Sequence, residues 1–153
     1  MPVRVIRYEA PGWGVGEIWL EDALLVNHEL PSARRSGETT SHPLVERLLA
    51  YFGGERVDFG DVELDLEWTT SFQRAVAATL RRVPYGEVVT YGELAALAGH
   101  PNAQRAAGSF CAGNRFPLLV PCHRVVAANG LGAYGSLGTD YKRRLLALEG
   151  ARA

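Results

Sequence analysis

Three chemically able side chains stand side by side in this sequence, between two apolar runs. The motif Pro121-Cys122-His123-Arg124 follows the apolar residues 118–120 and precedes the pair 125–126. A thiol becomes a good nucleophile as the thiolate, and a neighbouring base or cation lowers its pKa. The stiff proline would set the direction of the sulfur. Because adjacent side chains of an extended segment point to opposite faces, a contact between Cys122 and His123 needs a turn or a bridging water. The alternative is a buried structural cysteine beside a solvated His-Arg pair.

Charge is divided unevenly between the two halves of the chain. Residues 1–70 hold 6 Arg and 13 acidic residues, a net charge of −7, whereas residues 71–153 hold 10 Lys or Arg and 4 acidic residues, a net charge of +6. This polarity favours an acidic half kept off nucleic acid and a basic half that binds it. A solvated surface whose charges segregated by chance would give the same pattern.

The first half of the chain is patterned as strands followed by one helix. Residues 3–8, 16–20 and 23–28 are predicted to be strands, and residues 57–67 an irregular strand. Pro43 suits a first helical turn, and the helix that it opens should run to Phe52, before two glycines. With 153 residues, 47% of them hydrophobic, the chain can bury a core. We predict a strand-rich domain over residues 1–68 and a helical domain over residues 69–153.

The second half is patterned as three helices. A helix after Thr70 is followed by one over residues 91–98, in which Leu94, Leu97 and Ala98 should face inward, and by one opened by Pro101. Helix, Gly-containing turn, helix is the helix-turn-helix arrangement. The last of these helices is nearly bare on one surface, from which Arg105 projects. A bare face favours close helix packing or, equally, approach to a narrow groove with one arginine inserted into the base stack.

The Pro-Cys-His-Arg-Val motif (residues 121–125), with Tyr91, Arg105, Asn114 and Glu149 at matching spacing, resembles the active-site signature of the alkylguanine-DNA alkyltransferase family. The resemblance covers residues 71–150. It implies an α/β (α+β) fold with a ribonuclease-H-like N-terminal domain and a winged helix-turn-helix in the C-terminal domain. A pair of strands around Asn129-Gly130 would form the wing.

The resemblance also implies direct reversal of DNA damage, in which a methyl or larger alkyl group passes irreversibly from guanine oxygen to the Cys122 thiolate. His123 would act on Cys122 through a water, and Glu149 would orient His123 and favour its cationic form. Tyr91 would donate a proton toward the ring nitrogen of guanine, and Asn114 would brace the turn that holds the cysteine. Each molecule should act once.

The implied partner is double-stranded DNA containing alkylated guanine, bound through its minor groove with the base flipped out. Arg105 would fill the gap left by that base. The expected DNA-binding residues are Thr90, Ala103, Arg105, Ala106, Gly108 and Arg124, although Arg124 could instead hold a structural ion pair. The expected pocket residues are Val125, Tyr134 and Ser136. This chain departs from the family in the pair Ala133-Tyr134, where the tyrosine comes one place early, so we expect its pocket wall to differ from the family's.

We expect no cofactor and no metal, since the chain has only two cysteines and none before Cys111, which should lie in the core. Two cysteines and no apolar run of membrane-spanning length favour a reducing, intracellular setting: cytoplasmic, or nuclear in a eukaryote. A monomer is expected. Two rival functions are a lesion-binding protein that flags damage without transfer, although such proteins lack the cysteine, and an unrelated cysteine hydrolase that turns over repeatedly.

Overall fold

The structure is a computed structural model that describes residues 2–151. Its internal contacts divide the chain into two units. One, here called the sheet unit, runs through Asp65 and includes the separate segment Arg115–Pro117. The other, here called the helical unit, comprises Leu66–Asn114 and the chain from Leu118 onward. Three residues from the middle of the helical sequence therefore belong to the sheet unit.

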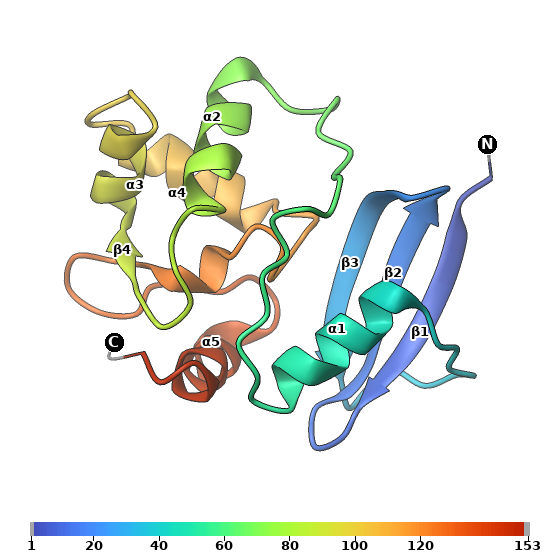
Figure 1. Cartoon of the computed structure of the whole chain (residues 1–153). Coiled ribbons are helices and arrows are strands. Elements are labelled where there is room, and N and C mark those ends of the chain that lie inside the picture. Colours follow the sequence, from blue (N-terminus) through green and yellow to red (C-terminus); the bar gives the residue numbers. More distant parts are fainter. Residues whose placement is uncertain (1, 152–153) are drawn as a thin grey trace. The chain divides into compact units, whose positions relative to one another are not determined.

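The sheet unit is an antiparallel sheet of three strands with one helix. The strands β1 (Arg4–Ala10), β2 (Gly14–Glu21) and β3 (Leu24–Ser32) are neighbours in that order, which confirms the three predicted strands with slightly longer bounds. The helix α1 (Pro43–Phe52) lies across one face of the sheet (Figure 1) and has the predicted bounds. Proline fits its first turn, and His42 caps it by accepting a hydrogen bond from the backbone N–H of Leu44.

The predicted irregular strand over residues 57–67 is wrong. The segment forms turns, and only Leu64 bridges Leu25 of β3. The side chain of Asp58 accepts a hydrogen bond from the backbone N–H of Gly60, which bends the chain as an aspartate turn does. Within this segment, strand pairing is therefore limited to Leu64.

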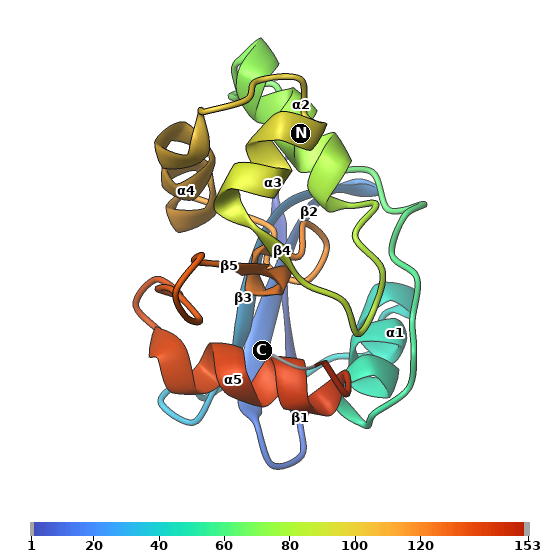
Figure 2. The same cartoon turned by 90° about the vertical axis from the view of Figure 1, so that its left-hand side faces the viewer.

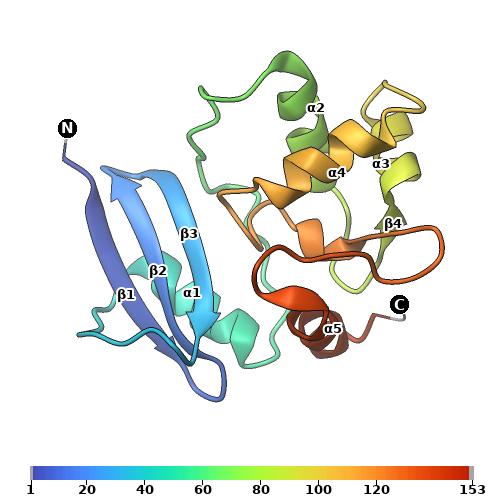
Figure 3. The same ribbon diagram turned by 180° about the vertical axis from the view of Figure 1, so that it is seen from behind.

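In the part of the chain that the structure describes, the helical unit contains four α-helices, one 3₁₀ turn and a two-stranded parallel pair. The helices are α2 (Ser71–Leu80), α3 (Tyr91–Leu97), α4 (Gln104–Ala112) and α5 (Gly138–Leu148). The strands β4 (Val89–Thr90) and β5 (Val125–Val126) run side by side between α3 and α5 (Figure 2). Seen from behind, α4 lies against α2 and α3 (Figure 3), with which it makes contacts.

Two helix starts in this unit use the same device. Thr70 caps α2 with Gln73, and Thr90 caps α3 with Glu93, each pair satisfying two free backbone N–H groups reciprocally. Thr90 thereby places Tyr91 at the first position of its helix.

Three details of the helical unit differ from the predictions. Leu97, expected to face inward, is 66% exposed. The helix α4 begins at Gln104 rather than at Pro101, because Asn102 takes a left-handed backbone conformation with φ of 70° and closes the preceding turn. The turn at Asn129-Gly130 joins only an isolated bridge between Ala127 and Gly130, so the described chain has no pair of wing strands between β5 and α5.

Among the described residues, no helix has the length and apolar character needed to cross a bilayer.

Candidate active site

The cysteine lies on a tight turn rather than on a strand. Pro121 has φ of −79° and ψ of 68°, and the backbone N–H of Cys122 donates to the carbonyl of Val120 at 2.8 Å. This is an inverse γ-turn, whose φ matches the angle that the proline ring imposes. A single 3₁₀ turn, Cys122–Arg124, follows. The extended arrangement that would have separated the cysteine and histidine side chains is therefore not formed.

Asn114 fixes this turn from the end of α4. Its side-chain amide donates to the carbonyl of Val120 at 2.8 Å and to the sulfur of Cys122 at 3.3 Å. One amide group thus holds both the backbone before the cysteine and the sulfur itself. The structure brings Asn114 to the position expected of a brace.

His123, Arg124 and Glu149 form a buried cluster below the cysteine. The Nε2 atom of His123 lies 2.6 Å from Oε2 of Glu149, and Arg124 donates to both carboxylate oxygens, at 2.9 and 3.0 Å. The backbone N–H of Gly86 adds a fourth hydrogen bond, at 3.2 Å. Burial raises the pKa of Glu149, but the hydrogen bonds from His123 and Arg124 outweigh it and hold that pKa well below its usual range. Glu149 is therefore a carboxylate.

The protonation of His123 follows from its partner. Because a carboxylate only accepts, Nε2 of His123 carries the hydrogen, and Nδ1 is left as a bare acceptor. Nδ1 is buried and has no hydrogen-bond partner in the described chain. Burial lowers the pKa of His123 below 6.5 despite the opposing effect of Glu149. The imidazole is thus neutral at pH 7: Glu149 favours the cation, as expected, but burial outweighs its effect.

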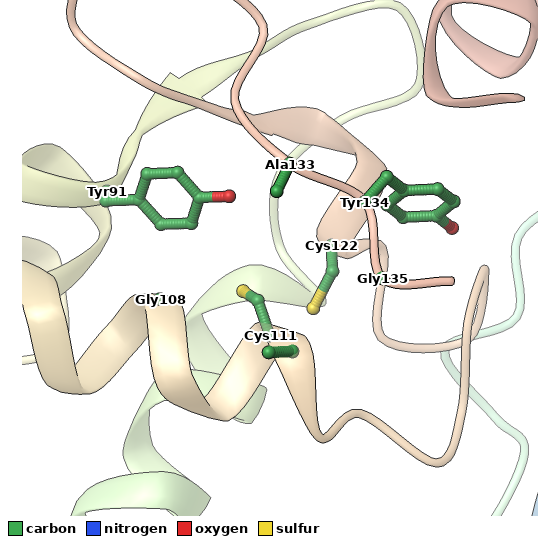
Figure 4. Close-up of a pocket in the computed structure, with 8 residues that line it drawn as sticks. Tyr91, Gly108, Cys111, Cys122, Ala133, Tyr134 and Gly135 are labelled. Atoms are coloured by element: carbon green, nitrogen blue, oxygen red, sulfur yellow. The ribbon is translucent and has the colours of Figure 1, made fainter. Parts of the chain in front are cut away.

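A pocket opens beside the cysteine (Figure 4). Its volume is about 60 Å³, and the side chains of Tyr91, Cys111 and Cys122 point into it. The complete lining is Tyr91, Gly108, Cys111, Ala112, Cys122, Ala133, Tyr134 and Gly135. Although Cys122 is only 4% exposed, its sulfur therefore faces a space and is not sealed in the core.

The thiol is protonated in the free protein. Burial and the neighbouring Cys111 raise the pKa of Cys122 well above 9.0, and the opposing effects of Asn114 and Lys142 are smaller. The expectation of a thiolate at rest is therefore wrong, because desolvation dominates at this depth. Burial, followed by the two cysteines, also raises the pKa of Tyr91 to about 12, so its hydroxyl stays a donor at neutral pH.

Two residues at the site escaped the sequence reasoning. Cys111, expected in the core, lines the pocket, and its position three residues after Gly108 on the bare face of α4 was the available signal. Lys142 on α5 is fully buried, donates to the carbonyl of Ala133 at 3.3 Å and places Nζ 5.8 Å from the centre of the Tyr91 ring. Nothing local in the sequence marks a lysine as buried. Within residues 2–151, no three His, Cys, Asp or Glu side chains gather as metal ligands.

The expected DNA-binding residues lie in different settings. Arg105 and Ala106 are exposed on α4, and Ala103 is half-buried just before it. Gly108 faces the ring of Tyr91, where an added Cβ would lie 3.8 Å from the ring. Arg124 is buried on Glu149, and its guanidinium also donates to the carbonyl of Val83 at 2.8 Å. The ion-pair alternative for Arg124 is thus the one observed, and the phosphate contact is not available to it.

Of the three expected pocket residues, only Tyr134 lines the pocket. Val125 is fully buried in β5, and Ser136 is exposed outside the lining. The hydroxyl of Tyr134 points away from Tyr91 (Figure 4), is buried and has no partner in the described chain. The early tyrosine thus contributes to the pocket wall although its ring points away from Tyr91, and Gly135 occupies the next position of the wall.

Comparison with known proteins gives concordant matches. Residues 71–151 match the family model of the 6-O-methylguanine DNA methyltransferase DNA-binding domain. The methylated-DNA–protein-cysteine methyltransferase of Methanopyrus kandleri is 47% identical over 75% of this chain and 85% of its own length. The protein of that name from Mycolicibacterium paratuberculosis is 50% identical over 69% of this chain, which spans 62% of that relative. A crystal structure of Mycobacterium tuberculosis OGT in complex with DNA is 38% identical, with a TM-score of 0.80, and the match covers 97% of this chain and 95% of that one.

Proposed function

This chain belongs to the 6-O-methylguanine DNA methyltransferase family, and we propose that it repairs alkylated guanine in DNA by moving the alkyl group onto Cys122. The observation that carries the proposal is the pairing of a pocket-facing thiol with a neighbouring neutral histidine whose Nδ1 is free to take a proton. The relatives' names and the DNA complex of the Mycobacterium tuberculosis protein favour transfer over mere lesion binding.

The proton of the thiol has a defined destination. It passes from Cys122 through a water molecule to Nδ1 of His123, and the carboxylate of Glu149 stabilises the imidazolium that forms. Base-assisted ionisation replaces a resting thiolate, as the raised pKa of Cys122 requires. Asn114 donates to the sulfur and Lys142 lowers its pKa, so both stabilise the developing negative charge.

The transfer itself is a single displacement. The sulfur forms a bond to the alkyl carbon, the bond between that carbon and the guanine oxygen breaks, and its electron pair stays on guanine. Tyr91, neutral at pH 7, donates a hydrogen bond from its hydroxyl toward a ring nitrogen of the departing base and offsets that charge. A thioether is a poor leaving group, so each molecule acts once.

The finer architecture belongs to the same proposal. Residues 69–153 would form the DNA-binding and catalytic domain, with α3 and α4 as a helix-turn-helix, and residues 1–68 a ribonuclease-H-like domain. The nearly bare face of α4 would approach the minor groove of the duplex, and the exposed Arg105 would enter the space of the flipped base. The protein would act as a monomer, and its DNA affinity would fall as salt rises.

One mass measurement tests the proposal against both rivals. The protein is incubated with duplex DNA containing 6-O-methylguanine, and the peptide bearing Cys122 is weighed. Transfer predicts one added CH₂ per molecule on that peptide, and Cys122→Ser should bind the same DNA and gain nothing. Tight binding with unchanged mass would favour a lesion-flagging protein, and repeated turnover would favour a hydrolase; either result overturns the proposal.

A further inference from the structure

The segment between Asn114 and the cysteine is held by a histidine from the other end of the chain. His28 on β3 is buried, and its backbone N–H donates to the carbonyl of Arg115 at 2.8 Å. Its side chain adds a second link: Nδ1 lies 2.7 Å from the carbonyl of Pro117. These two bonds explain why Arg115–Pro117 groups with the sheet unit although both of its flanks belong to the helical unit.

The hydrogen-bond partners fix the state of the His28 ring. A carbonyl only accepts, so Nδ1 carries the hydrogen that binds Pro117. Nε2 then accepts from the hydroxyl of Tyr8, at 2.6 Å. Burial lowers the pKa of His28 to about 4, which keeps the ring neutral with this arrangement of donors and acceptors at pH 7. Both ring nitrogens are thus hydrogen-bonded: Nδ1 to Pro117, in the segment that leads to Cys122, and Nε2 to Tyr8 of strand β1.

The Pro117 carbonyl belongs to the peptide that leads into a strained residue. Leu118 has φ of 74°, a left-handed conformation that is strained for a residue with a Cβ. Such strain persists only where the surroundings hold the chain on both sides. On one side is the bond from His28 to Pro117; on the other, Arg81 donates to the carbonyl of Leu119 at 3.1 Å.

The strained residue is followed at once by the turn that carries the nucleophile. Val120 accepts hydrogen bonds from Asn114 and from the backbone of Cys122, so a change at Leu118 reaches the sulfur within four residues. We propose that His28 is a positioning residue for alkyl transfer: its bond to Pro117 holds Leu118 in the left-handed conformation and thereby sets the direction of the Cys122 sulfur. This inference rests on the proposed function for its rate prediction, but not for its prediction about the thiol.

The two ring nitrogens can be removed separately. An asparagine side chain places an amide where Nδ1 lies and can keep the bond to Pro117, whereas a glutamine reaches only the position of Nε2 and can keep the bond to Tyr8. His28→Asn and His28→Gln each lose one hydrogen bond, so they should be destabilised similarly. Only His28→Gln loses the link that we assign to positioning. Should His28→Gln not fold, His28→Leu fills the same space without a donor and takes its place.

Two readouts separate positioning from stability. The first is the single-turnover rate constant for transfer from 6-O-methylguanine duplex at saturating DNA; the second is the rate at which iodoacetamide labels Cys122 without DNA, followed on its peptide. We expect His28→Gln to slow both at least tenfold and His28→Asn to stay within about threefold of the unmodified protein. Equal rates in the two variants, or rates that follow only their melting temperatures, would overturn the inference. If no variant transfers a methyl group, the labelling rates still decide the role of His28, and the proposed function alone fails.

Discussion

The two buried histidines of this chain, His28 and His123, are held in different ways. The ring of His28 has a neutral partner at each nitrogen, the hydroxyl of Tyr8 and the carbonyl of Pro117. The ring of His123 has an ionised partner, Glu149, at Nε2 and none at Nδ1 in the described chain. Burial lowers the pKa of both rings, so both are neutral at pH 7. Protonation state therefore does not distinguish them.

What distinguishes them is where a proton could go. A proton added to His28 has no free site, since its one acceptor nitrogen is already bound. A proton added to His123 takes Nδ1 and is stabilised through the ring by the carboxylate on the other side. A buried histidine with both nitrogens satisfied serves structure, and one with an unsatisfied nitrogen opposite a carboxylate serves as a base.

Changing Glu149, the ionised partner of His123, should have the largest effect on stability. Glu149→Gln leaves the buried guanidinium of Arg124 without its counter-charge, and breaking a buried ion pair in this way costs about 3–5 kcal/mol of unfolding free energy. Urea titration measures the loss. The control is Asp61→Asn, which breaks an exposed pair with Arg47 and should cost less than about 1 kcal/mol. Equal losses in the two variants would show that Glu149 contributes no more than a surface carboxylate.

Removing the unpartnered Nδ1 of His123 should have the next largest effect, on the rate of transfer. His123→Gln can keep a donor to Glu149 but has nothing at the Nδ1 position, so transfer should slow by about 10²- to 10⁴-fold, the usual contribution of a general base. Affinity for the methylated duplex should be unchanged, because His123 is fully buried. Single-turnover rates and a binding titration check both expectations. A rate within threefold of the unmodified protein would remove His123 from the proton path.

Features carried by neighbouring residues were predictable from the sequence. The helix α1 follows from Pro43 and the spacing of its apolar face, and its bounds agree with the structure. The cysteine, histidine and arginine of the motif are consecutive, so their proximity required no knowledge of the fold. The resemblance to the alkyltransferases then directed attention to Glu149, which is 26 residues from His123 and would otherwise pass for an ordinary helix end.

Features set by distant contacts were not predictable. His28 binds Pro117 across 89 residues, and no local pattern connects them. Leucine gives no sign of a left-handed conformation, so the apolar run before the motif did not indicate that Leu118 turns the chain. The direction of the Cys122 pKa was also misjudged, because neighbouring basic residues indicate a lower value and only the fold reveals how strongly burial raises it. Tertiary burial outweighed local chemistry in this case.

Acid should destabilise the protein through both histidines. Each has a folded pKa below the unfolded value of 6.5, so the unfolded state binds protons more readily, and stability is complete above pH 6.5 and falls as the pH drops. For His28, with a folded pKa of about 4, the loss between pH 6.5 and 5 is about 2 kcal/mol. Urea titrations at pH 7, 6 and 5 should show a shallower decline for His28→Gln than for the unmodified protein. Parallel curves would mean that His28 is not held neutral by the fold.

The smallest effect should come from a neutral partner. Tyr8→Phe keeps the buried ring, which stacks on His28 at 6.0 Å, and removes only the hydroxyl that donates to Nε2. The loss of one neutral hydrogen bond costs about 0.5–1.5 kcal/mol of unfolding free energy. The transfer rate should not change, since the link to Pro117 remains.

A matched control for this change is Tyr134, a second tyrosine whose hydroxyl is buried. In Tyr134→Phe the removed hydroxyl is buried without a partner, so its loss should leave the unfolding free energy unchanged or raise it, because a buried polar group without a hydrogen bond is itself destabilising. In thermal melts of the two variants side by side, the melting temperature of Tyr8→Phe should therefore fall, and that of Tyr134→Phe should rise or stay unchanged. If Tyr134→Phe lost as much stability as Tyr8→Phe, the hydroxyl of Tyr134 would be hydrogen-bonded in solution, and the wall of the pocket would be more polar than its structure indicates.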